Sequence, residues 1–450
     1  MNCITSRVFH TTVRTGFTKR AVFLSVLFAF LSSTSYGQWD SFEKDRTRGM
    51  LSNIKKAIEK NYYDPSFHGV NLEEKFKTAD EKIKAATSLG QAYGIIGQTL
   101  IDLNDSHTFF IPPQRTARVE YGWKMSMIGD KAFIIAVKPG SDADKKGLKV
   151  GDEVFSVNGF RPTRSDLWKM NYYYYQISPR SAMRLSIRSP GAEPRELDID
   201  AKVKTLKRTI DLNQDLDIND LIREIENESA RRYHRFQTVD NIIVWKMPGF
   251  SFEPGQVDEI MQGRVKRGAH LILDLRGNGG GYVKTLEKLT GYFFDKDIKI
   301  ADVKRRKESE VSMAKTAGSA NVFTGEVVIL IDSQSGSAAE MFAKLMQVEK
   351  RGYVIGDRSA GAVMQARFFP MQMGTEKVVF YGASITDADV IATDGKSLER
   401  VGVTPDETVL LTGEDLAKSR DTVMSRAVEK LGGKISPEDA GKFFPIEWDN

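Results

Sequence analysis

The stretch "EVVILIDSQSGSAAEMFAKL", residues 326–345, decides the fold of the second half of this 450-residue chain. Its apolar run is typical of a buried strand, and the apolar spacing that follows is typical of a helix. Between them, Gly336 and two alanines leave the hydroxyl of Ser337 uncrowded. Ser337 is either an N-terminal cap or a nucleophile, because the N–H of Ala338 and the positive helix end can stabilise a negative oxygen. These residues alone leave both interpretations open.

Strands and helices alternate on both sides of this stretch. Continuous apolar strands separated by helical patterns predict an α/β layer with a mainly parallel, buried sheet over residues 241–415. The other strands expected in this layer are "NIIVWKM", "AHLILDLR", "RGYVIGD" and "EKVVFYG".

One predicted strand ends in a run of glycines, "DLRGNGGGYVK", residues 274–284. The run lacks the lysine of a phosphate-binding loop, and Tyr282 stands where a dinucleotide fingerprint requires glycine. A tight turn with positive φ and a close backbone approach to an oxyanion remain compatible uses. The lipase-type Gly-x-Ser-x-Gly elbow is absent, because Ser335 and Ala339 occupy its glycine positions.

The first 37 residues are typical of a secretory signal. Four basic residues precede an apolar run, Ala21–Leu31, which is too short to span a bilayer. Removing this segment lowers the formal net charge from +5 to about +1, so nothing favours a nucleic-acid partner. The only cysteine, Cys3, would leave with it, which excludes disulfides and cysteine nucleophiles from the mature protein.

Four further segments are expected outside the core. Residues 40–118 form an N-terminal helical domain, from apolar residues at three- and four-residue spacing that Pro112 and Pro113 end. Residues 119–205 switch to strands, 206–240 form a charged connecting helix, and 416–450 form a helical tail.

Val137–Gly159, "VKPGSDADKKGLKVGDEVFSVNG", resembles the core of a PDZ domain. Such domains bind the C-terminus of a polypeptide by adding it as an edge strand and holding its carboxylate in backbone N–H groups. The resemblance places the binding loop at Tyr121, Gly122, Trp123, Lys124 and Met125. A domain that only packs or gates is the alternative, and the role of the run Tyr172–Tyr175 is left open.

A signal segment, helices, a PDZ-like domain, "DLRGNGGG", "SGSAAE" and "LERVGVTPD", in this order, resemble the tail-specific or C-terminal processing serine peptidases and their tricorn-like relatives. The resemblance implies a multidomain α+β protein whose core is ClpP/crotonase-like. It also implies that Ser337 attacks the peptide, with the N–H groups of Ala338 and Gly280 as oxyanion hole, although the glycine is uncertain by one position.

The same resemblance suggests the base. The processing-peptidase branch uses a lysine, but "GDRSAGAVMQ" places Ala362 where it would fall. The tricorn-like branch uses a histidine and a late glutamate, which map to His107 in "NDSHTFF" and to Glu399, acting directly or through Ser106. Neutral imidazole suits proton transfer near pH 7. A capping His107, a surface Glu399, or Lys344 as base remain alternatives.

These observations predict an exported serine endopeptidase, periplasmic or secreted, that acts on polypeptides or their C-terminal tails. A catalytically silent PDZ-containing binding protein is the main alternative, motivated by the missing lysine, and hydrolysis of a non-peptide ester is a weaker one. No metal motif, cofactor motif or further membrane span is recognised, and the oligomeric state is left open.

Overall fold

The computed structural model describes residues 39–448 apart from 116, 206–233 and 375–377. The predicted signal segment, Cys3 and nearly all of the predicted connecting helix lie outside the described residues. Residues 1–41 form a unit of their own, of which only the last three residues are described, and the features below belong to the unit Phe42–Asn450 apart from Ser41, the first residue of α2. Within the described residues, no helix is long and apolar enough to cross a membrane.

The N-terminal helices are α2 (Ser41–Asn61), α3 (Leu72–Ala85) and α4 (Leu89–Ile101). Their buried residues recur every three or four positions, as in Met50, Ile54 and Ile58 of α2, so one stripe of each helix faces the core. The helical prediction is wrong from Phe109 to Ile111, which form strand β1. β1 pairs antiparallel with the late strand β17 (Val379–Ala392).

A five-stranded antiparallel sheet follows, in the order β3-β4-β5-β6-β7, with helices α5 (Asp142–Lys145) and α6 (Leu167–Asn171). The strands are β3 Trp123–Ile128, β4 Lys131–Val137, β5 Glu153–Val157, β6 Ala182–Arg188 and β7 Arg195–Asp200. β3 lies at the edge of this sheet. Tyr172–Tyr175 lie in the helical turn η2 (Tyr172–Ile177), where Tyr174 is buried in the core and Tyr173 and Tyr175 are partly exposed.

The core sheet has the order β18-β15-β14-β11-β10-β9, and all of its pairs are parallel except β10 with β9. Its strands are β9 Arg235–Val239, β10 Ile242–Lys246, β11 His270–Asp274, β14 Val327–Ile331, β15 Tyr353–Gly356 and β18 Glu407–Thr408. The predicted parallel layer is therefore present. β9 falls within residues 206–240 and is a strand, where a helix was expected.

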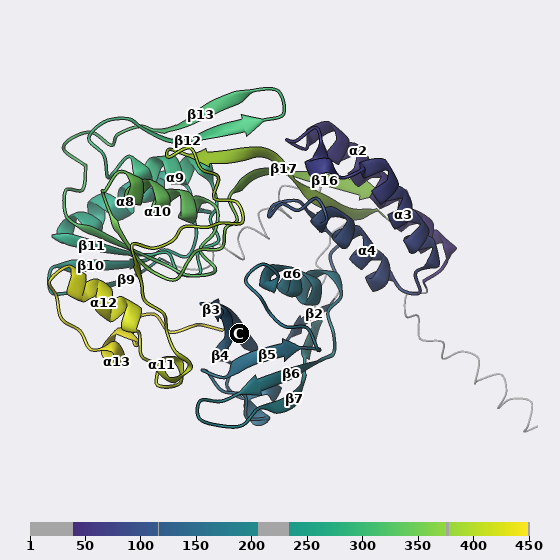
Figure 1. Cartoon of the computed structure of the whole chain (residues 1–450), viewed down its shortest axis with the longest axis horizontal. Helices are drawn as coiled ribbons and strands as arrows, with labels where there is room; N and C mark the ends of the chain where they lie inside the picture. The colour runs from purple at the N-terminus through teal and green to yellow at the C-terminus, as the bar shows by residue number, and fades with distance from the viewer. Residues whose placement is uncertain (1–38, 116, 206–233, 375–377, 449–450) are drawn as a thin grey trace, which may run out of the picture. The chain divides into compact units, whose positions relative to one another are not determined.

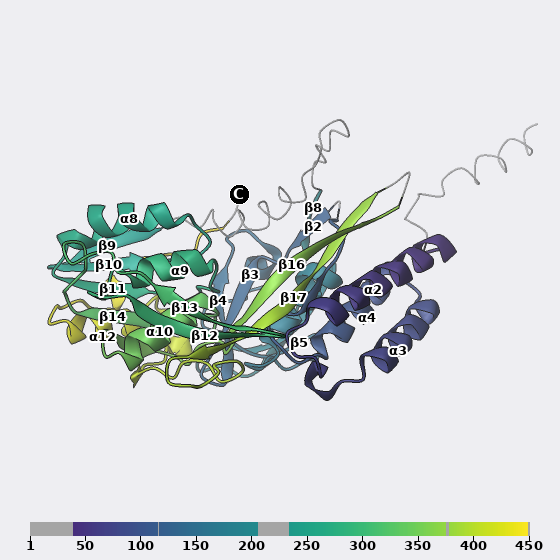
Figure 2. The same ribbon diagram turned by 90° about the horizontal axis from the view of Figure 1, so that it is seen from above.

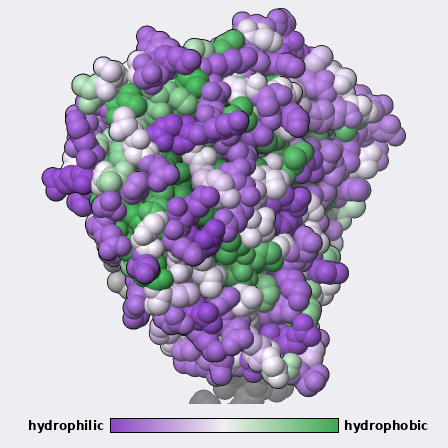
Figure 3. All heavy atoms as spheres, turned by 60° about the vertical axis from the view of Figure 1, so that its left-hand side comes forward, coloured by the Kyte–Doolittle hydropathy of each residue, from purple (hydrophilic) through white to green (hydrophobic). Residues whose placement is uncertain are grey.

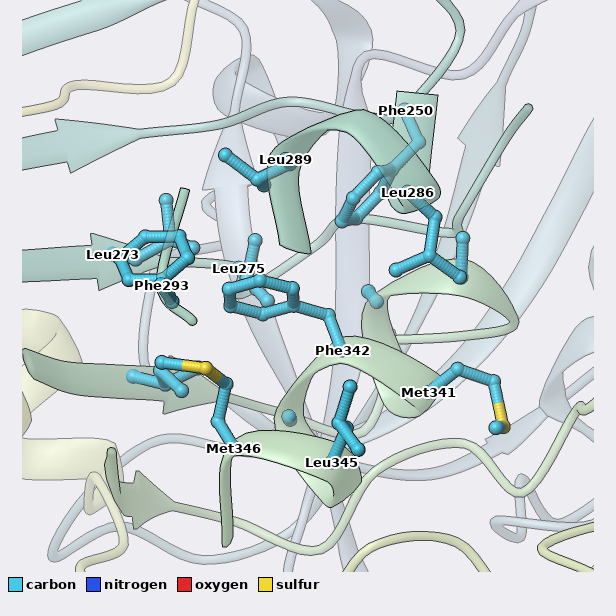
Figure 4. Packing of buried hydrophobic residues seen from close by; sticks show 14 of the residues in the cluster. Phe250, Leu273, Leu275, Leu286, Leu289, Phe293, Met341, Phe342, Leu345 and Met346 are labelled. Atoms are coloured by element: carbon cyan, nitrogen blue, oxygen red, sulfur yellow. The ribbon is translucent and has the colours of Figure 1, made fainter. Parts of the chain in front are cut away.

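Both faces of this sheet are covered by helices (Figure 1). Helices α8 (Pro254–Gly263), α9 (Val283–Thr290) and α10 (Ala338–Val348) cover one face, and α12 (Thr422–Lys430) covers the other. Alternate residues of a strand serve each face, so Leu273 packs with the first group and Ile272 with α12. Figure 4 shows Phe342 of α10 between aromatic rings, 5.5 Å from Phe293 and 6.5 Å from Phe250 between centroids.

A second sheet has the order β1-β17-β12-β13, and β16 (Met364–Met373) also pairs with β17. β12 is Ile298–Arg305 and β13 is Ser309–Ala314. The segment "EKVVFYG" enters β17, so its assignment to the parallel layer is wrong. A short connection to β16 favours an antiparallel hairpin, because a parallel neighbour needs a crossover of a dozen residues or more. Figure 2 shows this hairpin extending toward α2 and α4.

The surface agrees with the charged composition of the protein. On the face drawn in Figure 3, hydrophobic side chains occur in small groups among hydrophilic ones. Single exposed apolar residues are normal on folded proteins and need no partner to explain them.

Candidate active site

Ser337 lies at the carboxyl end of β14, where a short turn leads into α10. Its φ of 54° and ψ of −119° lie in a region that residues with a side chain rarely adopt, and Ser337 forms a capping box with Glu340, the third residue of α10. Backbone strain of this kind costs about 1–3 kcal/mol and is concentrated at functional sites. An ordinary N-cap has extended backbone, so the backbone conformation of Ser337 differs from that of a simple cap.

The carboxylate of Glu340 holds Ser337 in this conformation. Glu340 is fully buried, and it accepts hydrogen bonds from the N–H of Ser337 at 3.0 Å, the hydroxyl of Ser359 at 2.5 Å, and the N–H groups of Gly361 at 2.8 Å and Ala362 at 2.9 Å. Burial raises its pKa to about 7, and the four donors oppose that rise. One side chain therefore joins the serine turn to residues 359–362.

The residues around Ser337 must be small because they pack closely against the glycine loop, residues 277–281. A Cβ on Gly280, which has a φ of 99°, would lie 2.6 Å from the Cβ of Ser337. The N–H of Gly336 donates to the carbonyl of Asn278 at 2.9 Å, so the two turns are bonded directly. Small residues here are a packing requirement and also bring the glycine backbone to the serine.

The two N–H groups expected to form an oxyanion hole differ in their present bonding. The N–H of Gly280 donates to the side-chain oxygen of Asn278 at 2.9 Å. The N–H of Ala338 has no partner among the described residues, and neither has that of Gly279, whose backbone lies beside Gly336. Gly279 and Ala338 therefore present the unused donors in this arrangement, one position from the predicted Gly280.

A series of hydrogen bonds joins the predicted histidine to the predicted glutamate through Ser106. Ser106 donates its hydroxyl to Glu399 Oε2 at 2.8 Å and its N–H to Glu399 Oε1 at 2.9 Å. The single hydroxyl proton of Ser106 is used in the bond to Glu399. In the contact of 2.7 Å between Ser106 Oγ and His107 Nδ1, the imidazole N–H must therefore be the donor and Ser106 Oγ the acceptor. His107 thus carries its proton on Nδ1 and keeps Nε2 free as a base.

Residues 362 and 363 connect the two halves of the site. The N–H of Ser337 donates to the carbonyl of Ala362 at 2.9 Å, and the N–H of Val363 donates to Glu399 Oε2 at 2.9 Å. Ala362, the position where the lysine of the other branch would fall, therefore contributes backbone to the site. Lys344 pairs with Asp394 at 2.8 Å, which directs it to another partner and disfavours it as a base.

Burial shifts the ionisation of both predicted partners of Ser337. Desolvation lowers the pKa of His107 below 6.5, and the nearby Asp105 partly offsets this. Desolvation also raises the pKa of Glu399, while the hydrogen bonds from Ser106 and Val363 lower it. A neutral imidazole beside an acceptor is the form that can remove a proton from a hydroxyl near pH 7.

Residues 242–409 match the model of peptidase family S41. The protein contains an S41 peptidase domain. Members of this family are serine proteases, which are hydrolases. The matched range includes Ser337 and Glu399, whereas His107 and Ser106 precede it.

Known relatives agree with this assignment. The C-terminal processing peptidase, chloroplastic, of Tetradesmus obliquus is 22% identical over 377 residues, which cover 78% of this chain and 75% of that protein. A tricorn protease homolog of Streptomyces coelicolor is 31% identical over 162 residues, or 35% of this chain and 12% of the other. The crystal structure of mature CPAF shares the fold, with a TM-score of 0.62 at 13% identity over 84% of this chain and 95% of that one.

Two residues that support the S41 site were not anticipated. Asp105 is buried and accepts from the N–H groups of His107 at 2.9 Å and Thr108 at 2.7 Å, from the hydroxyl of Thr386 at 2.6 Å, and from that of Tyr62 at 2.8 Å. It fixes the turn that carries His107. The only feature of the sequence that could have indicated this role of Asp105 is its position two residues before His107. Asn278, which links the two turns, gave none.

Strand β3, which contains the last three residues of the predicted PDZ loop, contacts the serine turn, residues 332–337 between β14 and α10. Within the loop, Tyr121 is buried and donates its hydroxyl to the carbonyl of Arg180 at 3.0 Å. Farther along β3, Ser126 accepts from the side chain of Gln334 at 2.8 Å, and Ser333 donates to the carbonyl of Met127 at 2.5 Å. The loop is therefore joined to the serine turn through β3.

A metal site is not indicated. Among the described residues, no cluster of histidine, cysteine, aspartate and glutamate side chains could hold a metal ion.

Replacing Glu340 by glutamine tests whether its carboxylate organises the S41 site. Glutamine places an NH2 group against buried N–H donors, so at least one of them is left unsatisfied, at a cost of about 1–3 kcal/mol. We expect urea denaturation to show a loss of that size in the free energy of unfolding. Glu349→Gln, at the exposed end of α10, is the control and should change it by less than about 0.5 kcal/mol. Equal stability of the two variants would contradict this role.

Proposed function

We propose that this protein is an exported serine endopeptidase of the tricorn-like, Ser-His-Glu type. The observation that carries the proposal is the bonded series Glu399–Ser106–His107, which leaves His107 Nε2 as a base and is linked to the strained Ser337 through the adjacent residues Val363 and Ala362. The S41 domain supports peptide hydrolysis as the reaction. A signal segment at residues 1–37 supports export, to the periplasm or the exterior.

The proposed reaction has two steps. In acylation, His107 Nε2 takes the proton of Ser337 as its oxygen attacks the peptide carbonyl, and that proton then goes to the leaving amine as the C–N bond breaks. In deacylation, His107 removes a proton from water, which attacks the ester, and returns it to Ser337. Glu399 acts through Ser106 to stabilise the imidazolium. Ala338 and a glycine N–H stabilise the oxyanion, with Gly279 or Gly280 as the second donor.

Ser337→Ala tests the nucleophile. We expect a fluorophosphonate probe to label the wild type at one serine and the variant at none, because only an activated hydroxyl reacts with it. Cleavage of unfolded β-casein should fall by at least about 10³-fold. Ser165→Ala, an exposed serine elsewhere in the protein, should behave like the wild type. A wild type that takes no label would favour the alternative, a catalytically silent tail-binding protein.

The pH dependence of labelling tests the base. Protonated His107 cannot accept the proton of Ser337, so the rate should fall as the pH drops through the pKa of His107. Because burial lowers that pKa, we expect the inflection below pH 6.5, with a plateau above it. A rate that inflects above pH 8 would instead indicate a lysine base and contradict the assignment of His107.

We also propose that the sheet β3–β7 is a PDZ domain that recruits or gates substrate C-termini. Three features support this: β3 is an edge strand of its sheet, the resemblance places the carboxylate loop at Tyr121–Met125, and Ser126 and Met127 of β3 contact Ser333 and Gln334 in the serine turn. A peptide added to β3 would therefore border the turn that leads to Ser337.

Gly122→Ala tests the recruitment of substrate tails. A Cβ at Gly122, whose φ is 75°, would lie 2.5 Å from the Cβ of Ser141 and distort the loop. We expect KM for a polypeptide with a free C-terminus to rise about tenfold or more, matching the KM of the amidated polypeptide with wild type, while kcat is retained. Gly159→Ala, with a φ of 81° and open space around it, controls for backbone strain. Equal KM for free and amidated tails in the wild type would contradict recruitment.

A further inference from the structure

A buried cluster of four charges lies where the glycine loop begins. Arg276 donates to Asp274 from Nε at 3.0 Å and Nη2 at 2.8 Å, and to Asp421 from Nη1 at 2.9 Å and Nη2 at 2.8 Å. Lys246 adds a bond of 3.1 Å to Asp274. Lys246 and Asp274 end the adjacent strands β10 and β11, whereas Asp421 comes from the C-terminal tail, beyond the S41 match at residues 242–409.

Asp421 supplies one of the two carboxylates that are bonded to Arg276, and Asp332 adds a further negative charge near Lys246. Lys246 and Arg276 are cations, and Asp274 is bonded to both of them. The side chains of Lys246, Arg276 and Asp421 are each 15–17% exposed and that of Asp274 is 1% exposed, so water screens the cluster weakly. Burial raises the pKa of Asp274, but the neighbouring Arg276 and Lys246 outweigh it and lower the pKa overall. Removing the charge of Asp421 would leave Arg276 with a single bonded carboxylate, that of Asp274, which Arg276 shares with Lys246.

The cluster is bonded to the backbone of the glycine loop. Lys246 donates to the carbonyl of Arg276 at 2.5 Å, and Asp274 accepts the N–H of Arg276 at 3.0 Å. The next N–H, of Gly277, donates to Asp332 at 2.9 Å in the serine turn, and Asn278 accepts the N–H of Gly336. Movement of Arg276 would therefore shift the loop that packs on Ser337.

Asp421 is also rigidly held on its own side. It is the N-cap of α12, accepting the N–H of Met424 at 2.9 Å, and its own N–H donates to the carbonyl of Pro437 at 2.8 Å. Helix α12 packs on the core sheet through Val423, Met424, Ala427 and Val428. A guanidinium held in two bidentate contacts is fixed in plane and position.

We propose that Asp421 is a positioning residue for the oxyanion loop, so that the C-terminal tail is a working part of the active site. This proposal rests on the proposed peptidase function. Asp421 touches neither Ser337 nor the glycine N–H groups. It acts through Arg276, whose position determines the backbone conformation of residues 276–280, which pack against Ser337.

Asp421→Asn separates this role from helix capping, because asparagine caps a helix as well as aspartate does but carries no charge. We expect kcat for β-casein cleavage to fall about tenfold or more with KM within about twofold, since oxyanion donors act in the transition state. The control is Asp415→Asn, which alters the cap of α11 (Gly413–Ala417) in the same tail without touching Arg276. Asp421→Glu, which restores the charge, should recover part of kcat.

Hydrogen–deuterium exchange provides a readout that does not depend on peptidase activity. In Asp421→Asn, the hydrogen-bonded amides of Arg276, Gly277, Asn278, Gly280 and Gly336 should exchange at least about tenfold faster than in the wild type or in Asp415→Asn. Unchanged exchange of this loop would overturn the positioning role whatever the activity. If the loop of Asp421→Asn exchanges faster but the wild type neither cleaves β-casein nor reacts with the fluorophosphonate, the structural link between Asp421 and the loop is supported. The peptidase assignment is then rejected.

Discussion

The arrangement of the site depends on one buried carboxylate, that of Glu340. It lies one turn into α10, and its four hydrogen bonds reach the serine turn and the segment 359–362, which are about two dozen residues apart in sequence. The next residue, Val363, holds Glu399. A single acceptor thus determines both the strained backbone of Ser337 and the path of the backbone toward the histidine. The burial of a charged group is tolerated because every acceptor position is filled.

The second constraint is the pairing of β1 with β17. His107 belongs to the helical front of the protein, and it reaches the site because Phe109–Ile111 join a sheet built mainly from residues 298–392. Asp105 then bonds to Thr386 of β17, so the turn carrying Ser106 and His107 is fixed from the opposite side. Two unrelated sheets therefore deliver the two halves of the site, and the bridge at residues 362–363 joins them.

Much of this could be read from the sequence, for local reasons. The strand–turn–helix pattern around Ser337 and the parallel core follow from apolar period and small residues, and the S41 match agrees with them. Ser106, His107 and Glu399 lie together as the resemblance suggested, while their catalytic roles stay predictions. The pairing of strands that are distant in sequence could not be predicted, because the apolar period of residues 379–392 does not reveal whether the partner strand is parallel or antiparallel. No pattern in the sequence indicated that the side chain of Asn278 would accept a hydrogen bond from the N–H of Gly280.

The bond between Ser106 and Glu399 spans 293 positions of the sequence. A ribosome or a translocation channel releases the histidine long before the glutamate that orients it, and Asp421 emerges later still. A growing or half-folded molecule accordingly has a serine and an imidazole but no aligned proton path between them. On the proposed function, hydrolytic activity would then arise only in the completely folded molecule, so partly folded copies would cut neither themselves nor one another.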